Sequence, residues 1–267
     1  MADKNRLDIL LYERGFTDSR EKAKKLINEG SVAVNGKIQK KAGFSVGESD
    51  AIELCGEVMP YVSRGGFKLE KAIKVFDLEL RGLTCADIGA STGGFSDCML
   101  QNGAVKVFAI DVGSDQLSYK LRNDARVINL EKTNFRYVDK NLFAPGVDFA
   151  SVDVSFISLE HILPNLYEIL KDDGQAVCLI KPQFEAGKEN VGKNGVVKDL
   201  TIHTDVVDKI YDFAIDCGFD VSGFDFSPIK GPQGNIEYLI HLSKSEGKTS
   251  VIKDEIKNTV VLSHESF

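Results

Sequence analysis

The most distinctive chemistry in this sequence begins in a glycine-rich stretch, Asp-Ile-Gly-Ala-Ser-Thr-Gly-Gly-Phe, which runs from Asp87 to Phe95. The stretch continues a short apolar run typical of a buried strand, and its glycines would let main-chain amides approach a ligand closely. The next apolar run ends in Asp111, and an acid at that place commonly holds a ribose diol. Together these features indicate a nucleoside-bearing cofactor, although a tight turn followed by a strand-end acid would look the same.

The glycine spacing is GxxxGG rather than the GxGxxG of dinucleotide-binding proteins. The turn and the acid resemble those of S-adenosylmethionine-dependent methyltransferases. The resemblance implies that S-adenosylmethionine is the cofactor. It also implies a set of cofactor-binding residues, with Asn134 the weakest of them: Asp87, Gly89, Ser91, Gly93, Phe95, Asp111, Asn134 and Asp153.

The segment Ser-Val-Asp-Val-Ser-Phe, residues 151–156, narrows the choice of group that would receive the methyl. Enzymes that methylate base nitrogens usually carry Asp/Asn-Pro-Pro-Tyr/Phe at this place, and this chain does not. Enzymes that methylate C5 of cytosine use a cysteine, often after proline, and the chain has no Pro-Cys. A hydroxyl oxygen is therefore the favoured target.

A ribose 2′-hydroxyl is a poor nucleophile near neutral pH, so the enzyme must help to remove its proton. A lysine can accept that proton if burial or neighbouring cations make it neutral when needed. Two lysines and two acids, which we expect at strand ends, offer such a group: Lys68, Asp153, Lys181 and Glu237. Each of them alone would be interpreted as a surface or ion-pair residue.

In this order the four residues resemble the Lys-Asp-Lys-Glu tetrad of RrmJ/FtsJ-type RNA 2′-O-methyltransferases. The resemblance implies that Lys181 is the base and that Asp153 orients it beside the methyl donor. It implies that Lys68 and Glu237 tune the charge and position the ribose.

Longer motifs over roughly residues 4–243 resemble the TlyA family, in which an S4 domain is fused to an FtsJ-like methyltransferase. The resemblance implies 2′-O-methylation of cytidines in ribosomal RNA, with that RNA or a ribosomal subunit as the partner. The motifs are Ser-Arg-Gly-Gly-Phe-Lys-Leu (63–69), Gly-Ala-Ser-Thr-Gly-Gly-Phe (89–95), Asp-Val-Ser-Phe-Ile-Ser-Leu (153–159), Lys-Pro-Gln-Phe-Glu (181–185) and Gly-Asn-Ile-Glu-Tyr (234–238).

Strand-like and helical segments alternate from Thr84 onward, which predicts an α/β domain with a parallel sheet covered on both faces. The family resemblance implies that this domain has a Rossmann-like S-adenosylmethionine-dependent methyltransferase fold. We expect strands at 85–88, 105–111, 126–130, 147–153, 176–181, 219–226 and 236–242, and helices at 94–101, 159–170 and 202–217.

The first part of the chain predicts a small α+β module. Its signals are leucines at helical spacing, a cap at Thr17-Asp18-Ser19, a helix end at Gly30 and a hairpin turn at Asn35-Gly36. The residues from Arg6 to Lys41 include a long series that resembles, in the same order, the sequence pattern of the S4 RNA-binding domain. The resemblance implies that phosphates are contacted by Arg6, Arg20, Lys25 and Lys41. Arg6 and Asp8 could instead form a local ion pair that holds the module together.

These features divide the chain into an S4-like domain (1–58), a linker (59–63), a methyltransferase domain (64–245) and a tail or short helix (246–267). The tail has apolar residues at helical spacing, and it could dock on the body or fray. The connection from Lys181 to Lys198 is long, so it is either a functional cover or a mobile loop. As a cover it would place Lys188 and Lys193 against RNA phosphates.

The composition sets limits on the function. The chain has 267 residues, a net charge of −7 and 43% hydrophobic residues, which excludes general disorder. Residues 1–41 hold ten basic and six acidic residues, as in a module that meets a polyanion, or in a solvated helix face. The five cysteines are widely spread, without a CxxC pair, so we expect neither a disulfide framework nor a metal site.

No apolar run approaches the roughly 18 residues of a membrane-spanning helix, and the N-terminus is polar. We therefore expect a cytoplasmic protein without a membrane partner. Two other functions remain open from the sequence. One is a non-catalytic assembly factor that binds ribosomal RNA, against which the intact glycines, acids and lysines weigh. The other is a membrane-active haemolysin, a name that this family has carried.

Overall fold

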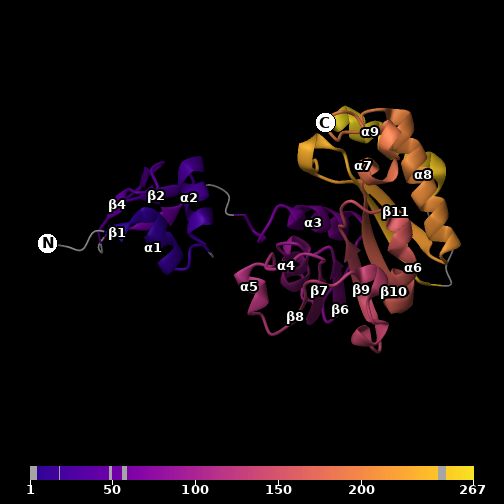
Figure 1. Ribbon diagram of the computed structural model, residues 1–267, viewed down its shortest axis with the longest axis horizontal. Coiled ribbons are helices and arrows are strands. Elements are labelled where there is room, and N and C mark those ends of the chain that lie inside the picture. The colour runs from indigo at the N-terminus through magenta and orange to yellow at the C-terminus, as the bar shows by residue number, and fades with distance from the viewer. Residues whose placement is uncertain (1–4, 18, 48–49, 56–58, 246–250) are drawn as a thin grey trace. The chain divides into compact units, whose positions relative to one another are not determined.

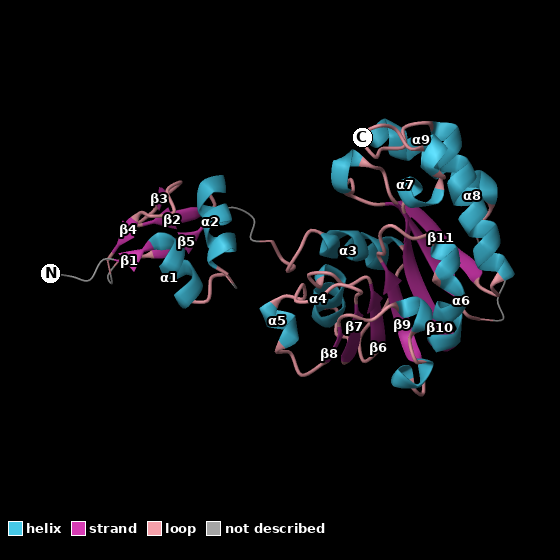
Figure 2. Cartoon of the chain, in the orientation of Figure 1, coloured by secondary structure: helices cyan, strands magenta, loops and turns pink. Residues whose placement is uncertain are grey.

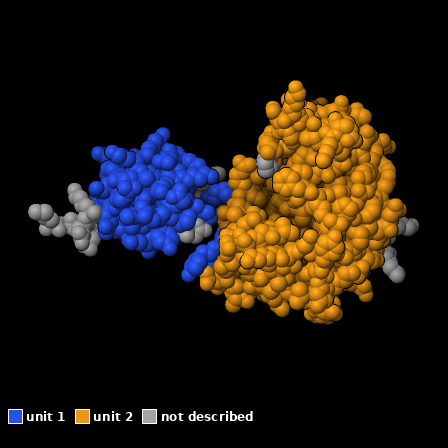
Figure 3. All heavy atoms as spheres, viewed as in Figure 1, with its two compact units in different colours: residues 1–60, 118–120 blue, residues 61–117, 121–267 orange. Residues whose placement is uncertain are grey.

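Figure 1 presents the computed structural model, which describes residues 5–17, 19–47, 50–55, 59–245 and 251–267. The chain divides into two compact units, residues 1–60 with 118–120 and residues 61–117 with 121–267 (Figure 3). Several predictions fall on positions outside the described residues: the polar N-terminus, Asp18 in the cap, the domain boundary at 58 and the start of the tail.

The first unit combines two helices with short strands (Figure 2). Ser19 caps the second helix by accepting a hydrogen bond from the amide of Lys22, and Gly30 ends that helix with φ +81°. The predicted hairpin is confirmed, because the strands on either side of Asn35-Gly36 pair antiparallel. The elements are β1 (Asn5–Arg6), α1 (Leu7–Glu13), α2 (Arg20–Glu29), β2 (Val32–Val34), β3 (Lys37–Ile38), β4 (Ser45–Val46) and β5 (Ile52–Leu54).

The second unit is built on a sheet whose seven described strands lie in the order β11-β12-β10-β9-β6-β7-β8. The strands from β10 to β8 are parallel, and β12 is antiparallel to both of its neighbours. All seven predicted strands are present, and β10 begins earlier than predicted. Their bounds are β6 (Thr84–Ile88), β7 (Lys106–Ile110), β8 (Val127–Leu130), β9 (Val147–Val152), β10 (Leu170–Ile180), β11 (Asp220–Phe226) and β12 (Tyr238–Ser243).

Side-chain alternation along the strands divides the core into two layers. On one face, Ala86 and Ile88 of β6 pack with α6 (Leu163–Ile169), α8 (Leu200–Asp216) and α9 (Lys253–Ser266). On the other face, Cys85 packs with α3 (Gly65–Val75), α4 (Gly94–Gln101) and Leu121 of α5 (Tyr119–Arg122). Figures 1 and 2 show these two groups of helices on opposite sides of the sheet, so the α/β prediction is confirmed.

The strand order creates a crevice at the centre of the sheet. From β6 the chain moves outward through β7 and β8, and then returns to β9 on the other side of β6. In open α/β sheets, ligands bind at the carboxyl ends of the strands where the order reverses in this way. The glycine-rich stretch follows β6 and Asp153 follows β9, so both lie at this switch point.

Two helical predictions need correction. The single helix expected at 159–170 is a 3-10 turn (Leu159–His161) followed by α6, and Pro164 stands in the first turn of α6. Proline has no amide hydrogen and clashes with the preceding turn, so it belongs at a helix start rather than inside a longer helix. Helix α3 was not predicted at all, although Leu69 and Ala72 on its buried face have helical spacing.

The end of the chain forms α9, which packs against α8 and β11. Ile256 and Val260, two of the apolar residues singled out in the tail, are fully buried. The tail therefore docks on the body from Lys253 onward. Among the residues that the structure describes, no helix is long and apolar enough to cross a membrane.

Candidate active site

The sheet topology brings three of the four candidate catalytic residues to one edge. Asp153 follows β9 and Lys181 follows β10, which are parallel neighbours. Glu237 precedes β12, and because β12 is antiparallel to β10, it begins where β10 ends. The expectation that Lys68 lies at a strand end is wrong, because Lys68 lies in the N-terminal half of α3. A helix packed across the strand ends therefore supplies the fourth residue.

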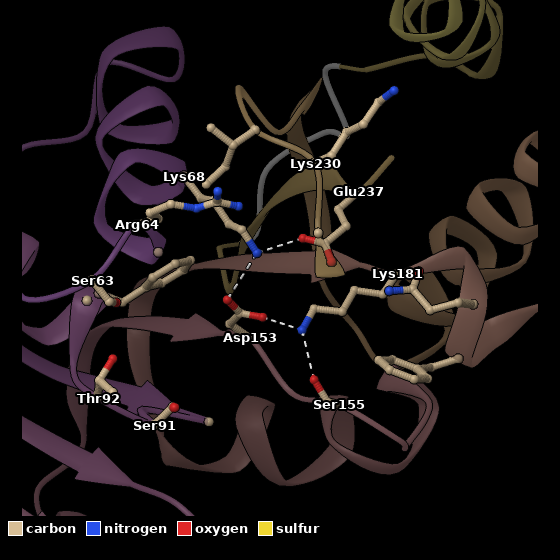
Figure 4. Close-up of a pocket in the computed structure, with 18 of the residues that line it drawn as sticks. Ser63, Arg64, Lys68, Ser91, Thr92, Asp153, Ser155, Lys181, Lys230 and Glu237 are labelled. Atoms are coloured by element: carbon tan, nitrogen blue, oxygen red, sulfur yellow. Dashed lines mark hydrogen bonds and ion pairs between the residues drawn. The ribbon is translucent and has the colours of Figure 1, made fainter. Parts of the chain in front are cut away.

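The four charged side chains contact one another in a chain (Figure 4). Lys68 Nζ lies 2.6 Å from Glu237 Oε2 and 3.4 Å from Asp153 Oδ2. The other oxygen of Asp153 pairs with Lys181 Nζ, which also donates a hydrogen bond to Ser155 Oγ at 3.2 Å. The carboxylate of Asp153 thus bridges the two lysines.

Burial and neighbouring charges shift the pKa values of Lys68 and Asp153 in opposite directions. Burial works to lower the pKa of Lys68, but the carboxylates of Asp153 and Glu237 outweigh it, and the pKa is raised. Burial likewise works to raise the pKa of Asp153, and Lys181 and Lys68 outweigh it, so that pKa is lowered. Lys68 is therefore a cation and Asp153 an anion at neutral pH.

The glycine-rich turn requires glycine at its first bend. Gly89 has φ +88°, and a Cβ there would lie 2.5 Å from the carbonyl oxygen of Asp153. Asp111 fixes the turn from the neighbouring strand, since its carboxylate accepts hydrogen bonds from the amides of Ser91 at 2.8 Å and Gly113 at 2.7 Å. The turn therefore lies directly against the backbone of the charged cluster.

Asp87 has a different environment from the other candidate cofactor residues. It is fully buried, and its carboxylate accepts hydrogen bonds from the amide and hydroxyl of Ser96 and from the hydroxyl of Ser151. Ser96 lies in the first turn of α4, so Asp87 ties β6 to the start of that helix. Burial raises the pKa of Asp87 to about 6, and the hydrogen bonds only partly oppose it.

This raised pKa predicts a pH-dependent loss of stability. An unfolded aspartate titrates near pH 4, so Asp87 costs nothing below pH 4 and destabilises the fold as pH rises through about 6. We expect Asp87→Asn to gain about 2 kcal/mol relative to the wild type between pH 4 and pH 7. Urea unfolding of both proteins at several pH values measures this, and parallel curves would contradict it.

Two adjoining pockets open at the switch point. The first, of about 580 Å³, is lined by all four charged residues and by Phe95. The second, of about 410 Å³, is lined by Asp111, Asn134 and apolar side chains. Both pockets are lined by Gly89, Ser91 and Asp153. Gly93 lines neither of these two pockets, and it packs against Leu117 and Leu121. The four charged residues thus line the first pocket, and Asp111 lines the second.

The candidate RNA-binding residues of the first unit fall into two kinds. The carboxylate of Asp8, fully buried, accepts hydrogen bonds from Arg6 and Arg20, each with a contact of 2.9 Å. The hydrogen bond from Arg6 is the main cause that lowers the pKa of Asp8 to about 2. The ion pair between Arg6 and Asp8 that the sequence left open is thus present. About half of each arginine side chain stays exposed, so both can also contact a ligand.

The other candidate RNA-binding residues are exposed. Lys25 lies on α2, 4.0 Å from Glu29, and Lys41 lies in the turn before Phe44. In the second unit, Lys188 and Lys193 belong to the segment after Lys181, which contains a 3-10 turn at Lys188–Asn190. Val191 and Gly195 of this segment line the first pocket, so the segment covers part of it.

Sequence reasoning missed several residues that line the first pocket. Ser155 holds Lys181, and Arg64 and Lys230 add positive charge to the lining. Phe156 is 89% exposed with φ +63°, and its ring lies 4.9 Å from that of Phe184. A bulky residue with positive φ is a sign of strain that often accompanies function. Ser155, Phe156 and Phe184 stand in the quoted motifs around Asp153 and Lys181, which was the available signal.

Comparison with known proteins shows which families have this combination of domains. The FtsJ-like methyltransferase model matches residues 61–244, and the S4 domain model matches residues 5–52. YqxC of Bacillus subtilis is 46% identical over 270 residues, which cover 100% of this chain and 96% of that protein. The 16S/23S rRNA (cytidine-2′-O)-methyltransferase TlyA of Mycobacterium tuberculosis is 40% identical over 243 residues, 91% of each chain.

A solved structure from Streptococcus thermophilus that carries the name hemolysin is 48% identical to this chain. It covers 100% of this chain and 98% of its own length, with a TM-score of 0.77. The pocketed α/β unit is the part that the methyltransferase model matches, and the small α+β unit is the part that the S4 model matches. This chain belongs to the FtsJ-like methyltransferase family and carries an S4 domain before its methyltransferase domain.

Proposed function

We propose that this protein transfers a methyl group from S-adenosylmethionine to the 2′-hydroxyl of a cytidine in ribosomal RNA. The observation that carries the proposal is the convergence of Lys68, Asp153, Lys181 and Glu237 in one pocket beside the glycine-rich turn. The relative TlyA is named for this reaction on 16S and 23S rRNA. The family and the geometry therefore support the same chemistry.

The second pocket suits a nucleoside cofactor. Asp111 provides the acid expected for a ribose diol, and Ile110, Val112 and Phe135 provide apolar walls for an adenine. Asn134 lies in the same lining, and Gly89 and Ser91 adjoin the first pocket. When bound there, S-adenosylmethionine supplies an electrophilic methyl group on a sulfonium. Asp87 would act by fixing β6 and α4 around this site.

The first pocket suits the ribose. Glu237 lines this pocket, and one oxygen of its buried carboxylate has no hydrogen-bond partner among the described residues. The Lys181 amine would accept the proton of the 2′-hydroxyl as that oxygen takes up the methyl group that the cofactor would supply. Asp153 orients the Lys181 amine, and cationic Lys68 holds both carboxylates in place.

The test is methyl transfer from isotopically labelled S-adenosylmethionine to ribosomal subunits that lack the modification, followed by mapping of the labelled nucleotide. The proposal expects label on the 2′-oxygen of a cytidine. Label on a base would contradict the assigned acceptor. Binding to subunits without transfer of label would favour a non-catalytic assembly factor instead.

We further infer that the S4 domain holds RNA through the arginines around Asp8 and through Lys25 and Lys41, and that Lys188 and Lys193 add contacts near the first pocket. Phosphate contacts of this kind release counterions. We expect Arg20→Ala to weaken RNA binding and to lower the slope of log K against log salt by about 1.

Arg14→Ala is the matched control for Arg20→Ala, because Arg14 is an exposed arginine of the same unit with the same charge. Filter binding at several salt concentrations, together with thermal unfolding of each variant, separates RNA contact from stability. An unchanged salt slope in Arg20→Ala would assign Arg20 to the ion pair with Asp8 alone.

A further inference from the structure

A buried histidine connects three parts of the methyltransferase domain behind the first pocket. His203 lies in α8 and is fully buried. Its Nε2 lies 3.0 Å from the carbonyl oxygen of Val197, and its Nδ1 lies 2.6 Å from the hydroxyl of Tyr238. Because a carbonyl oxygen can only accept, Nε2 carries the hydrogen and Nδ1 accepts from Tyr238. Burial lowers the pKa of His203, which favours this neutral form.

The connection continues into the C-terminal helix. The hydroxyl oxygen of Tyr238 lies 3.2 Å from Oγ of Ser263, and because its own hydrogen goes to His203, it can only accept from Ser263. Ser263 has one hydrogen, which it donates either to Tyr238 or to the carbonyl of Val260 at 2.7 Å. Tyr238 and Ser263 are fully buried. In a buried site each of these bonds is costly to lose, since no water replaces it. When Ser263 donates to Tyr238, helix α9 is joined to β12 by a hydrogen bond as well as by apolar packing.

The two hydrogen-bond partners of His203, Val197 and Tyr238, lie within two residues of the lining of the first pocket. Val197 lies near the end of the covering segment, residues 186–199, and its amide donates to Oδ1 of the buried Asn235 at 3.1 Å. Both main-chain polar groups of Val197 are thus held by buried side chains. Tyr238 directly follows Glu237, and its side chain lies in the core layer on the opposite face of the sheet.

We propose that His203 is a positioning residue for methyl transfer, which fixes the covering segment 186–199 to β12, the strand that directly follows Glu237. This inference rests on the proposed function for its kinetic readout. In this arrangement α8 and α9 keep the covering segment and Glu237 in fixed positions relative to each other. Neither helix contacts substrate. The order of the covering segment then depends on the His203–Val197 bond.

The test compares two substitutions, each of which keeps a polar group near the position of only one ring nitrogen of His203. His203→Gln places a donor near the position of Nε2 and keeps the bond to Val197, whereas His203→Asn loses it. We expect His203→Asn to show faster amide hydrogen exchange over residues 191–197 and a kcat about tenfold lower, with the affinity for S-adenosylhomocysteine unchanged. We expect His203→Gln to restore both the protection and most of the turnover.

Ser263→Ala is a milder variant that keeps the bond between His203 and Val197, so segment 191–197 should stay protected. Thermal unfolding of all three variants identifies any that fail to fold. Wild-type exchange and wild-type kcat in His203→Asn would overturn the inference. So would faster exchange in His203→Gln equal to that in His203→Asn. A wild-type protein that transfers no methyl group to RNA would overturn the proposed function, and the exchange data would still decide the role of His203.

Discussion

Replacing Lys181 by alanine should lower the rate of methyl transfer by about 10²–10⁴-fold, the usual range for removal of a general base. Lys181 lies beside Asp153 in the first pocket and outside the lining of the second. Binding of S-adenosylhomocysteine, which we place in the second pocket, should therefore change little. Single-turnover transfer and calorimetric binding measure the two quantities separately.

A second variant separates proton acceptance from positive charge at this position. Lys181→Arg keeps the charge beside Asp153, but a guanidinium does not lose its proton in proteins. We expect Lys181→Arg to be nearly as slow as Lys181→Ala. Lys74→Ala is the control, because Lys74 is an exposed lysine on α3 outside both pocket linings. Turnover near the wild-type rate in Lys181→Ala would remove Lys181 from the mechanism.

The sheet could be predicted from the sequence because its strands carry strong local signals. Buried parallel strands appear as short apolar runs, and all seven were found. The α6 region could not be predicted as well, since Leu159–Leu170 has continuous helical spacing and the effect of Pro164 on the first turn depends on its surroundings. Helix α3 was missed because the glycines at its start suggest a loop. In the fold, Gly94 lets α4 approach the start of α3, because a Cβ on Gly94 would lie 2.9 Å from the amide of Gly66.

The candidate site shows the same division. Residue types and family motifs identified Lys68, Asp153, Lys181 and Glu237, and the structure brings their side chains together. That the four side chains act in catalysis stays a prediction. The buried connection through His203 could not have been found from the sequence. A lone histidine on a helix carries no local signal, and its partners come from a loop and a distant strand.

Gly89→Ala should impair both the fold and cofactor binding. Two causes contribute, the positive φ and the overlap of the new Cβ with Asp153, and a comparison with Gly82→Ala separates them. Gly89 has φ +88°, and its Cβ would meet the backbone of Asp153 at 2.5 Å. Gly82 has φ +80° with nothing within 4 Å of a Cβ. Gly82→Ala therefore reports the cost of positive φ alone, about 1–2 kcal/mol.

We expect Gly89→Ala to lose about 2–4 kcal/mol of stability. We also expect its affinity for S-adenosylhomocysteine to fall at least about tenfold, because an overlap on this scale must move either the glycine-rich turn or Asp153. Gly82→Ala should leave that affinity unchanged, because Gly82 lines neither pocket. Urea unfolding and calorimetric titration of both variants measure the difference. Equal losses in the two variants would mean that backbone strain, and not contact with Asp153, decides the effect, and the turn would then not be pressed against the charged cluster as the structure shows.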